Sequence, residues 1–367
     1  MLPPAFESGA LSYKFYSLAE NRVISLSGGE SSNLVPNEDL RFKGSSHGWL
    51  ALYNPRNLDL FLYNPLSRRH VKLPDVRSLP NIPQENLEGG YGCVIKVIIS
   101  CSPDEPDCRA MIIYNTNSAL AFCCPGRSNK WTPIGELYDW DAIPRRPARC
   151  YRNLVYSSRQ KVFFCITNSD ELETWDLQDL SSPRTVPMKV PDEEIYFSET
   201  EEEEKLRWLC QDFKHLVVNS DDDLLVVTRY TLDVDPDGSY VDVLEEGSEY
   251  RPHKTVDFDI QKYDPEDGGF EPVDDSSLGG LALFIGFYNH SVALSTTEFP
   301  ELKPNSIYFT DPLQTPTFKI DDLPFGGHDI GIFNFQGKTV SPCYYPCDVQ
   351  SIKRIVPSPV WFFPNWV

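Results

Sequence analysis

A possible serine nucleophile is the first chemical feature of the chain. Residues Gly44-Ser45-Ser46-His47-Gly48 match the pattern G-x-S-x-G, which in many hydrolases places a serine on a sharp turn between a strand and a helix. The residues that follow, WLALYNP, alternate as in a strand and lack the period of a helix. The context therefore favours a tight turn. In it, the two glycines adopt unusual backbone angles and the three polar side chains bond turn amides.

A calcium loop is the second possibility. Asp233, Asp235 and Asp237, followed by Gly238, resemble the beginning of an EF-hand loop. The twelfth position of such a loop requires a bidentate glutamate, but it falls on Leu244 here. The flanking residues have the pattern of strands. We therefore predict a β-hairpin with a Pro-Asp-Gly turn, whose clustered carboxylates leave weak calcium binding open.

The cysteines and glycines lack the spacing of a metal site or a nucleotide loop. Cys343 and Cys347 come nearest to a zinc pair, but no second pair lies near them in the sequence. Neither G-x-x-x-x-G-K-[ST] nor G-x-G-x-x-G occurs. We therefore predict that the protein has no metal and no cofactor, and that it is not an enzyme.

Two acidic groups offer the remaining chemistry: the run Glu201, Glu202, Glu203, Glu204 and the triplet Asp221, Asp222, Asp223. Two carboxylates about 5–9.5 Å apart would suit a glycosidase, and the triplet offers candidates. A short acidic turn before the strand LLVVTRY is the simpler interpretation. The glutamate run reads either as a solvated loop or as a surface that steers a basic partner. We take all seven residues as candidate contacts with a basic partner.

The charge of the chain is concentrated in one segment. The 367 residues carry a formal charge of −21, from 33 basic and 54 acidic side chains. Residues 192–275 hold 27 acidic and 7 basic side chains, so that this segment accounts for −20 of the total. A surface this acidic argues against nucleic acid as the main partner, because phosphate binding needs basic side chains. The partner we expect is a protein.

Short strands must position these residues. Apolar runs of four to seven residues, such as VIKVIIS and LALFIGFY, are separated by Gly, Pro, Asn and Asp, and only Glu201–Leu216 has a helical period. The 31 prolines, 21 glycines and 13% aromatic residues also fit many short strands joined by turns. This pattern predicts an all-β sandwich, barrel or propeller.

Internal repeats decide between these architectures. An aromatic strand, a turn and a short closing strand recur in six places, including LFLYNPLSRRHVKLP at 60–74, LAFCCPGRSNKWTPIG at 120–135 and FDIQKYDPEDGGFEPV at 258–273. We therefore predict a single β-propeller domain over residues 1–367, with four-stranded blades and an acidic insertion around 192–255. Six blades are the best count, and seven remain possible. The C-terminal run PVWFFPNWV would pair with the N-terminal strands and close the ring, which removes exposed sheet edges.

The cysteines and the termini predict the compartment. Several of the ten cysteines lie inside apolar runs, such as Cys165 in VFFCI, which favours free buried thiols over a disulfide framework. The N-terminus lacks the pattern of a secretory signal, and no apolar stretch approaches the about 20 residues of a membrane helix. We expect a monomer in the cytosol, the nucleus or both.

Several motifs resemble one known family. GSSHGWLAL at 44–52, followed by LDLFLYNPLSRRHVKLP, is similar to the opening of the plant KIB-type β-propeller family, formerly a plant domain of unknown function. The stretch LGGLALFIGFYNHSVALSTTEFPELKPNSIYFTD at 278–311 resembles its late blade, and GGHDIGIFNF at 326–335 resembles its closing strands. The resemblance covers nearly the whole chain and is weakest at about 140–255.

This resemblance implies a propeller that recognises proteins. Members of the family commonly carry an N-terminal F-box, which docks on the Skp-type adaptor of a cullin ubiquitin ligase while the propeller presents the substrate. Here the propeller repeats begin almost at Met1, which leaves no room for an F-box, so the sequence is either that of an F-box-less member or a piece of a longer protein. The expected function is therefore non-catalytic protein recognition, as in the substrate-binding part of such a ligase receptor. A stand-alone scaffold or competitor is the alternative, and a propeller glycosidase is a remote one.

Overall fold

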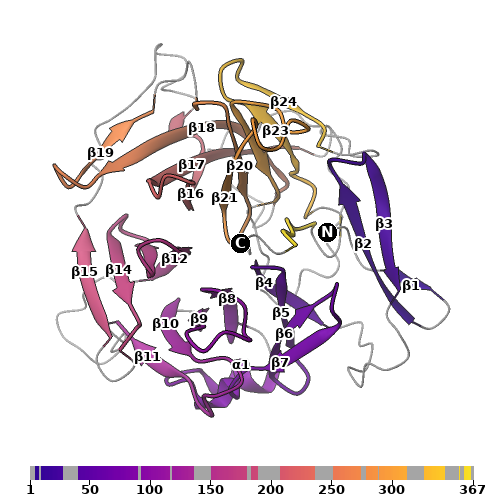
Figure 1. Cartoon of the computed structure of the whole chain (residues 1–367), viewed down its shortest axis with the longest axis vertical. Coiled ribbons are helices and arrows are strands. Elements are labelled where there is room, and N and C mark those ends of the chain that lie inside the picture. Colours follow the sequence, from indigo (N-terminus) through magenta and orange to yellow (C-terminus); the bar gives the residue numbers. More distant parts are fainter. Residues whose placement is uncertain are drawn as a thin grey trace.

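β-Strands arranged in a ring make up nearly all the regular structure of the protein (Figure 1). A computed structural model describes residues 5–7, 10–27, 40–89, 92–115, 118–135, 150–179, 183–188, 207–235, 251–273, 278–287, 289–311, 326–343, 355 and 359–364. Within these ranges the strands form five hydrogen-bonded sheets, and neighbouring strands within a sheet are almost all antiparallel.

Three of the sheets are four-stranded blades whose strands follow one another in sequence. The first blade contains β4 (Arg41–Ser46), β5 (Trp49–Asn54), β6 (Asp59–Asn64) and β7 (Arg69–Lys72). The second contains β8 (Val94–Ile99), β9 (Ala110–Tyr114), β10 (Ala119–Cys123) and β11 (Thr132–Ile134). The third contains β12 (Tyr151–Ser157), β13 (Val162–Thr167), β14 (Leu172–Asp176) and β15 (Arg184–Met188).

Two neighbouring blades are joined into one nine-stranded sheet. One half contains β16 (Gln211–Val218), β17 (Leu224–Asp233), β18 (His253–Asp264) and β19 (Gly269–Pro272). The other half contains β20 (Leu281–Ile285), β21 (Val292–Ser295), β22 (Ser306–Phe309), β23 (Gly331–Asn334) and β24 (Thr339–Ser341). The halves meet where β16 and β21 pair in parallel at Val218 and Val292. A three-stranded sheet of β1 (Ala5–Glu7), β2 (Ala10–Ser17) and β3 (Arg22–Ser27) completes the ring.

The burial of each strand follows its radial position in the ring. Strands near the axis pack between neighbours on both faces, so they are apolar along their length: β9, with the sequence AMIIY, is buried at every position. Outermost strands are largely exposed, as in β7, with the sequence RHVK. This gradient explains why continuous apolar runs alternate with short polar strands in the sequence.

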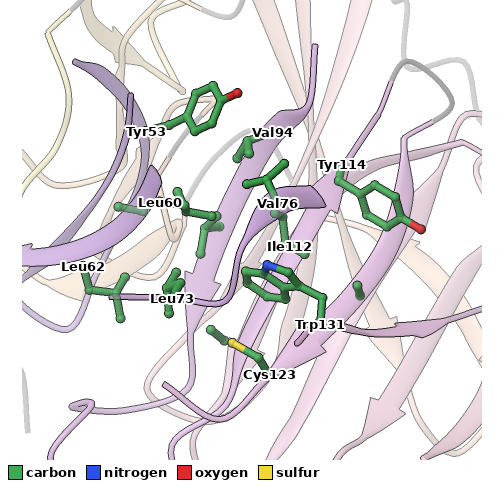
Figure 2. Close-up of a cluster of buried hydrophobic side chains, with 14 of the residues drawn as sticks. Tyr53, Leu60, Leu62, Leu73, Val76, Val94, Ile112, Tyr114, Cys123 and Trp131 are labelled. Atoms are coloured by element: carbon green, nitrogen blue, oxygen red, sulfur yellow. The ribbon is translucent and has the colours of Figure 1, made fainter. Parts of the chain in front are cut away.

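One hydrophobic cluster lies between each pair of neighbouring blades of the described ring. Figure 2 shows the cluster between the β4–β7 and β8–β11 blades, where the indole of Trp131 lies among aliphatic side chains such as Val76 and Ile112. Trp131 is 1% exposed, and its Nε1 donates a hydrogen bond to the Pro74 carbonyl at 3.0 Å. The indole therefore contributes apolar burial without leaving its N–H unpaired.

The two ends of the chain meet in the last two of these clusters. The ring of Phe362 lies 5.0 Å from that of Phe15 on β2, and Val360 packs into the cluster of the β4–β7 blade. On the other side, Trp361 Nε1 donates to the Ile285 carbonyl at 3.0 Å. The ends are thus adjacent, as predicted, although residues 359–364 contact the ring through side chains and single hydrogen bonds and not through a strand ladder.

The predicted all-β propeller of four-stranded blades is confirmed, and the described strands make six blade-like units. The helix expected over Glu201–Leu216 is wrong for its second half, because β16 begins at Gln211 and pairs with β17. A short helix, α1 (Gln84–Gly89), and a 3-10 turn, Val76–Ser78, lie in the connection between β7 and β8 and were not predicted. Among the described residues no helix has the length and apolarity needed to cross a membrane.

Candidate functional site

The propeller presents two faces, which the direction of its strands defines. Because neighbouring strands of a blade are antiparallel, the turns β4–β5, β8–β9, β12–β13 and β16–β17 lie on one face, here called the turn face. The innermost strands begin on the opposite face, here called the entry face. At about 3.3 Å per residue, the eight residues of β16 span about 23 Å between the two faces.

The predicted triplet Asp221–Asp223 forms the β16–β17 turn on the turn face. Asp222 has a φ of 71° and accepts a hydrogen bond from the Ser157 hydroxyl of the neighbouring blade. The Asp221 carbonyl accepts from Arg159 Nη1 of the same neighbour at 3.2 Å. Two of the three residues thus join the β16–β19 blade to the β12–β15 blade.

The third carboxylate of the triplet is paired within its own blade. Asp223 Oδ2 lies 2.8 Å from Lys262 Nζ and accepts from Asn219 Nδ2 at 3.0 Å. Burial alone would raise the pKa of Asp223, but the bonds from Lys262 and Asn219 lower it below its ordinary value. Asp221 is the exposed member of the triplet, so its carboxylate is the one best placed to meet a partner.

The predicted run Glu201–Glu204 lies outside the described residues. The chain re-enters the described structure at Arg207, which precedes β16 on the entry face. The next residue, Trp208, is 74% exposed, and Leu209 is 38% exposed. An indole this exposed is the most prominent apolar group on the described surface. Sequence reasoning missed it, although an aromatic residue directly after the charged stretch EEEEKLR was a usable signal.

Ion pairs and hydrogen bonds hold the turn that carries Trp208. Arg207 pairs with two carboxylates of β18, at 3.0 Å to Asp257 and at 2.8 Å to Asp259 Oδ1. Its guanidinium carbon lies 4.8 Å from the centre of the Tyr230 ring, and the Tyr230 hydroxyl donates to Asp259 at 2.8 Å. Trp208 therefore projects from an anchored position.

A histidine lies where the innermost strands converge on the turn face. His290 N donates to the Ser45 carbonyl at 2.9 Å, and its ring Nε2 lies 3.1 Å from Tyr156 N, which donates to it. The ring of His47 is 5.8 Å away. Burial lowers the pKa of His290 to about 3, so the ring is neutral at physiological pH and accepts this hydrogen bond. His290 thus links three blades across the axis.

Further polar side chains line the innermost strands. Lys96 on β8 is fully buried and donates to Asn153 Oδ1 on β12 at 3.2 Å. Asn153 Nδ2 in turn lies 3.5 Å from His215 Nδ1 on β16. Burial lowers the pKa of Lys96 to about 7. This chain of side chains connects three successive blades and lies inside the ring, where a protein partner cannot reach it.

The G-x-S-x-G segment has a structural role in the same region. Gly48 and His47 have positive φ values of 74° and 50°, as expected for a turn. Gly44 serves a different purpose, because a Cβ there would lie 1.9 Å from the Val97 carbonyl oxygen of the next innermost strand. Ser46 Oγ accepts from Ile99 N at 3.0 Å and so bonds the adjacent blade instead of a turn amide. The buried serines offer no nucleophile to a substrate.

A buried arginine joins the two halves of the nine-stranded sheet. Arg229 on β17 is 0% exposed and donates to Thr255 Oγ1 at 2.7 Å, to the Thr310 carbonyl at 2.5 Å and to Asp329 Oδ2 at 2.7 Å. Its guanidinium carbon also lies 4.5 Å from the centre of the Phe309 ring. Sequence reasoning missed this residue, whose signal is a lone charge inside the apolar run LLVVTRYTL.

Two histidines and a second carboxylate extend this cluster. His253 Nε2 lies 3.3 Å from Asp311 Oδ1, and His328 Nδ1 lies 3.8 Å from Asp311 Oδ2. Burial alone would raise the pKa of Asp311, but the charge of His253 lowers it to about 2. The same pairing raises the pKa of His253, against the effect of burial. Histidines paired with carboxylates also occur in the active sites of hydrolases. Here the side chains of the cluster are all under 10% exposed, so they stabilise the interface between the two blades instead of meeting a substrate.

The remaining motifs form no metal site within the described ranges. Asp233 ends β17 opposite His253 on β18, while Asp237, Gly238 and the second strand of the predicted hairpin lie outside those ranges. Cys343 is buried, and Cys347 lies beyond the residues that the structure describes. The nine described cysteines form no disulfide with one another, and no group of three metal-binding side chains occurs among the described residues.

These features define a class of protein, the β-propeller whose polar interior is used for blade-to-blade contacts. The family follows from the sequence: residues 15–334 match the family model of the KIB1-4 beta-propeller, and the chain belongs to this family. The Arabidopsis thaliana protein named "Putative F-box protein At5g55150" is 23% identical over 318 residues, which cover 84% of this chain and 73% of that protein.

Two solved propellers are among the structures to which the chain shows a weak similarity. The β-propeller domain of Cps50 (Swd1) from Myceliophteria thermophila has a TM-score of 0.36 and 8% identity, covering 90% of this chain and 81% of that one. The Dos1 propeller has a TM-score of 0.32 and 12% identity, covering 72% of this chain and 66% of that one. Both TM-scores are below 0.5, so neither similarity supports a conclusion about function.

Proposed function

We propose that this propeller is a non-catalytic protein-recognition module that binds a basic partner on its entry face, with Trp208 as the central contact. The exposed and anchored indole carries this proposal. Tryptophan dominates many protein interfaces, because its large rigid surface is buried at a small cost in conformational entropy. Leu209 extends the apolar surface beside it.

Charge supports a basic partner. Residues 192–275, within which Trp208 lies, carry a net charge of −20. A segment this acidic attracts cationic proteins over about one Debye length, about 8 Å at physiological ionic strength, and raises their association rate. The turn-face triplet contributes less, because Asp222 and Asp223 bond within the propeller and Asp221 alone is exposed.

The finer role we propose is that of a substrate receptor for a cullin ubiquitin ligase in the cytosol or nucleus. Membership of the KIB1-4 family and similarity to a protein named as an F-box protein support this role. In it, the propeller holds the substrate and an F-box, on this polypeptide or on an associated one, reaches the Skp-type adaptor. A propeller that binds the same substrates without an adaptor would act as a scaffold or competitor.

Affinity purification from native tissue tests the proposal, with the tagged wild type compared with two variants. Trp208→Ala removes the proposed contact, while Leu66→Ala removes a 52% exposed side chain on the turn face and serves as the matched control. We expect specific proteins to be enriched by the wild type and by Leu66→Ala. Their affinity for purified Trp208→Ala should fall at least about tenfold. Because both side chains are exposed, neither variant should change the melting temperature.

The outcomes separate the alternatives. Skp-type adaptor and cullin subunits among the enriched proteins would support the receptor role, and their absence beside a specific partner would favour a scaffold or competitor. Equal binding by wild type and Trp208→Ala would refute the entry-face site. Binding that does not weaken between 0.05 and 0.5 M salt, a range over which the Debye length shortens about threefold, would refute the basic partner.

A further inference from the structure

Two cysteines face each other across the base of the β8–β9 loop on the turn face. The ladder of β8 and β9 ends with Ile99 opposite Ala110, and Ser100 N then donates to the Arg109 carbonyl at 2.9 Å. The ladder ends here, because Arg109 N donates to Ser100 Oγ at 2.9 Å and not to the Ser100 carbonyl. Cys101 and Cys108 are the next residues on the two sides, and Cys108 Sγ lies 3.3 Å from the Cys101 carbonyl oxygen, which places the two cysteines side by side, as a disulfide requires.

The two thiols differ in exposure and in chemistry. Cys108 is 2% exposed, and its Sγ donates to the Cys101 carbonyl at 3.3 Å, whereas Cys101 is half-buried and reachable by a small solute. The contact between the two thiol groups lowers the pKa of Cys101, against the effects of burial and of Glu105. The same contact between the side chains, together with burial, raises the pKa of Cys108. Cys101 is thus the more acidic and the more accessible thiol of the pair, and Cys108 is the buried thiol beside it.

Contacts with neighbouring turns fix the loop between these cysteines. Asp104 receives two hydrogen bonds from Arg69 at the start of β7, at 2.6 and 2.5 Å. Arg127, in the β10–β11 turn, donates to the Pro106 carbonyl. The loop is therefore held at its tip, which keeps Cys101 and Cys108 together at its base.

We propose that Cys101 and Cys108 form a peroxide-sensitive modification site that closes to an intramolecular disulfide. The Cys101 thiolate attacks one oxygen of hydrogen peroxide; the O–O bond breaks, hydroxide leaves, and Cys101 becomes a sulfenic acid. The Cys108 sulfur then attacks the Cys101 sulfur. Hydroxide leaves the sulfenic acid and takes up the Cys108 proton as water. Overall, two thiols give two electrons to one peroxide, and two waters form.

Trypsin offers a direct readout of this reaction. Cleavage after Lys96 and Arg109 releases the peptide Val97–Arg109, which contains both cysteines and no others. After treatment of the whole native chain with hydrogen peroxide and alkylation of the remaining thiols, the disulfide appears as loss of two hydrogens from this one peptide. We expect it to form at least about fivefold faster than Cys150 is oxidised, because Cys150 is also half-buried but burial raises its pKa.

Two variants and one reagent complete the test. Cys108→Ser should stop oxidation at a Cys101 sulfenic acid that dimedone traps, and Cys101→Ser should leave Cys108 reduced. Independently of either variant, phenylarsine oxide, which bridges close thiol pairs, should protect both cysteines of the wild type from alkylation. The proposal is overturned if Val97–Arg109 stays reduced under conditions that oxidise Cys150. It is equally overturned if phenylarsine oxide leaves both thiols open to alkylation.

Discussion

Replacing Arg229 by methionine tests whether the buried cluster stabilises the joined blades. Methionine fills much of the same volume, but it removes the hydrogen bonds to Thr255, to the Thr310 carbonyl and to Asp329. Asp329, which is 8% exposed, would then remain buried without the guanidinium, and His253 Nε2, 3.9 Å away, would be its closest remaining basic group among the described residues. The variant therefore isolates the guanidinium charge and its hydrogen bonds from simple loss of volume.

The size of the effect follows from this burial. Removing one partner of a buried ion pair costs about 3–5 kcal/mol, because the remaining charge has lost both water and counter-charge. Unfolding entropy is about 2.1 cal/mol/K per residue, so for 367 residues this loss corresponds to a fall in Tm of about 4–6 °C. Differential scanning calorimetry at pH 7 would resolve the change.

An exposed arginine of the same protein provides the control. Arg69 also makes a two-point contact with a carboxylate, but its side chain and that of Asp104 are 57% and 46% exposed. Arg69→Met should leave Tm unchanged within error, because water screens an exposed pair. The double variant Arg229→Met/Asp329→Leu should recover most of the loss, since it removes both buried charges. An Arg229→Met variant no less stable than Arg69→Met would refute the assigned role.

Two further predictions concern stability. Gly44→Ala should lower Tm strongly or prevent folding, because its Cβ would lie 1.9 Å from a backbone oxygen; Gly269→Ala, whose Cβ has no atom within 4 Å, should be nearly neutral, and equal melting curves would contradict this. The lowered pKa of Asp311, about 2 against an ordinary 3.8, contributes about 2 kcal/mol that is present above pH 4 and lost as pH falls towards 2. The raised pKa of His253 contributes stability below pH 6.5 that is lost as pH rises through that pKa. The free energy of unfolding, measured with urea for wild type and Asp311→Asn, should therefore show a difference that narrows at low pH and at high pH. A difference that does not change with pH would count against the pairing of Asp311 with His253.

The strands and blades were predictable because their signals are local. Each blade repeats an apolar inner run, a turn and a polar outer strand, and this pattern follows directly from burial at different radii. The short helix predicted over Glu201–Leu216 is wrong from Gln211 onward, because a periodic pattern in one segment carries no information about a strand partner. The ladder between β16 and β17 satisfies the backbone of Gln211–Val218 instead.

The buried clusters and the surface site were not predictable in this way. Arg229 and Asp329 are 100 residues apart, and they meet because their blades pack against each other through a shared hydrophobic cluster and the β16–β21 junction. The charge of Asp221–Asp223 was visible in the sequence, but their partners Ser157 and Lys262 lie on other strands. The sequence therefore shows where charge lies along the chain, and the fold decides which charged side chains remain available to a partner.

The position of residues 359–364 has a consequence for synthesis of the protein. The ribosome adds about 350 residues between Phe15 and its contact Phe362, which at about 5–20 residues per second takes on the order of tens of seconds. The clusters that contain Val360 and Trp361 stay incomplete until these residues are made, so Leu50, and later Phe284 once it is synthesised, lack their last packing partners. The nascent propeller is thus an unclosed stack of blades with an apolar surface at each end, a form that chaperones recognise and that a stalled ribosome would leave exposed.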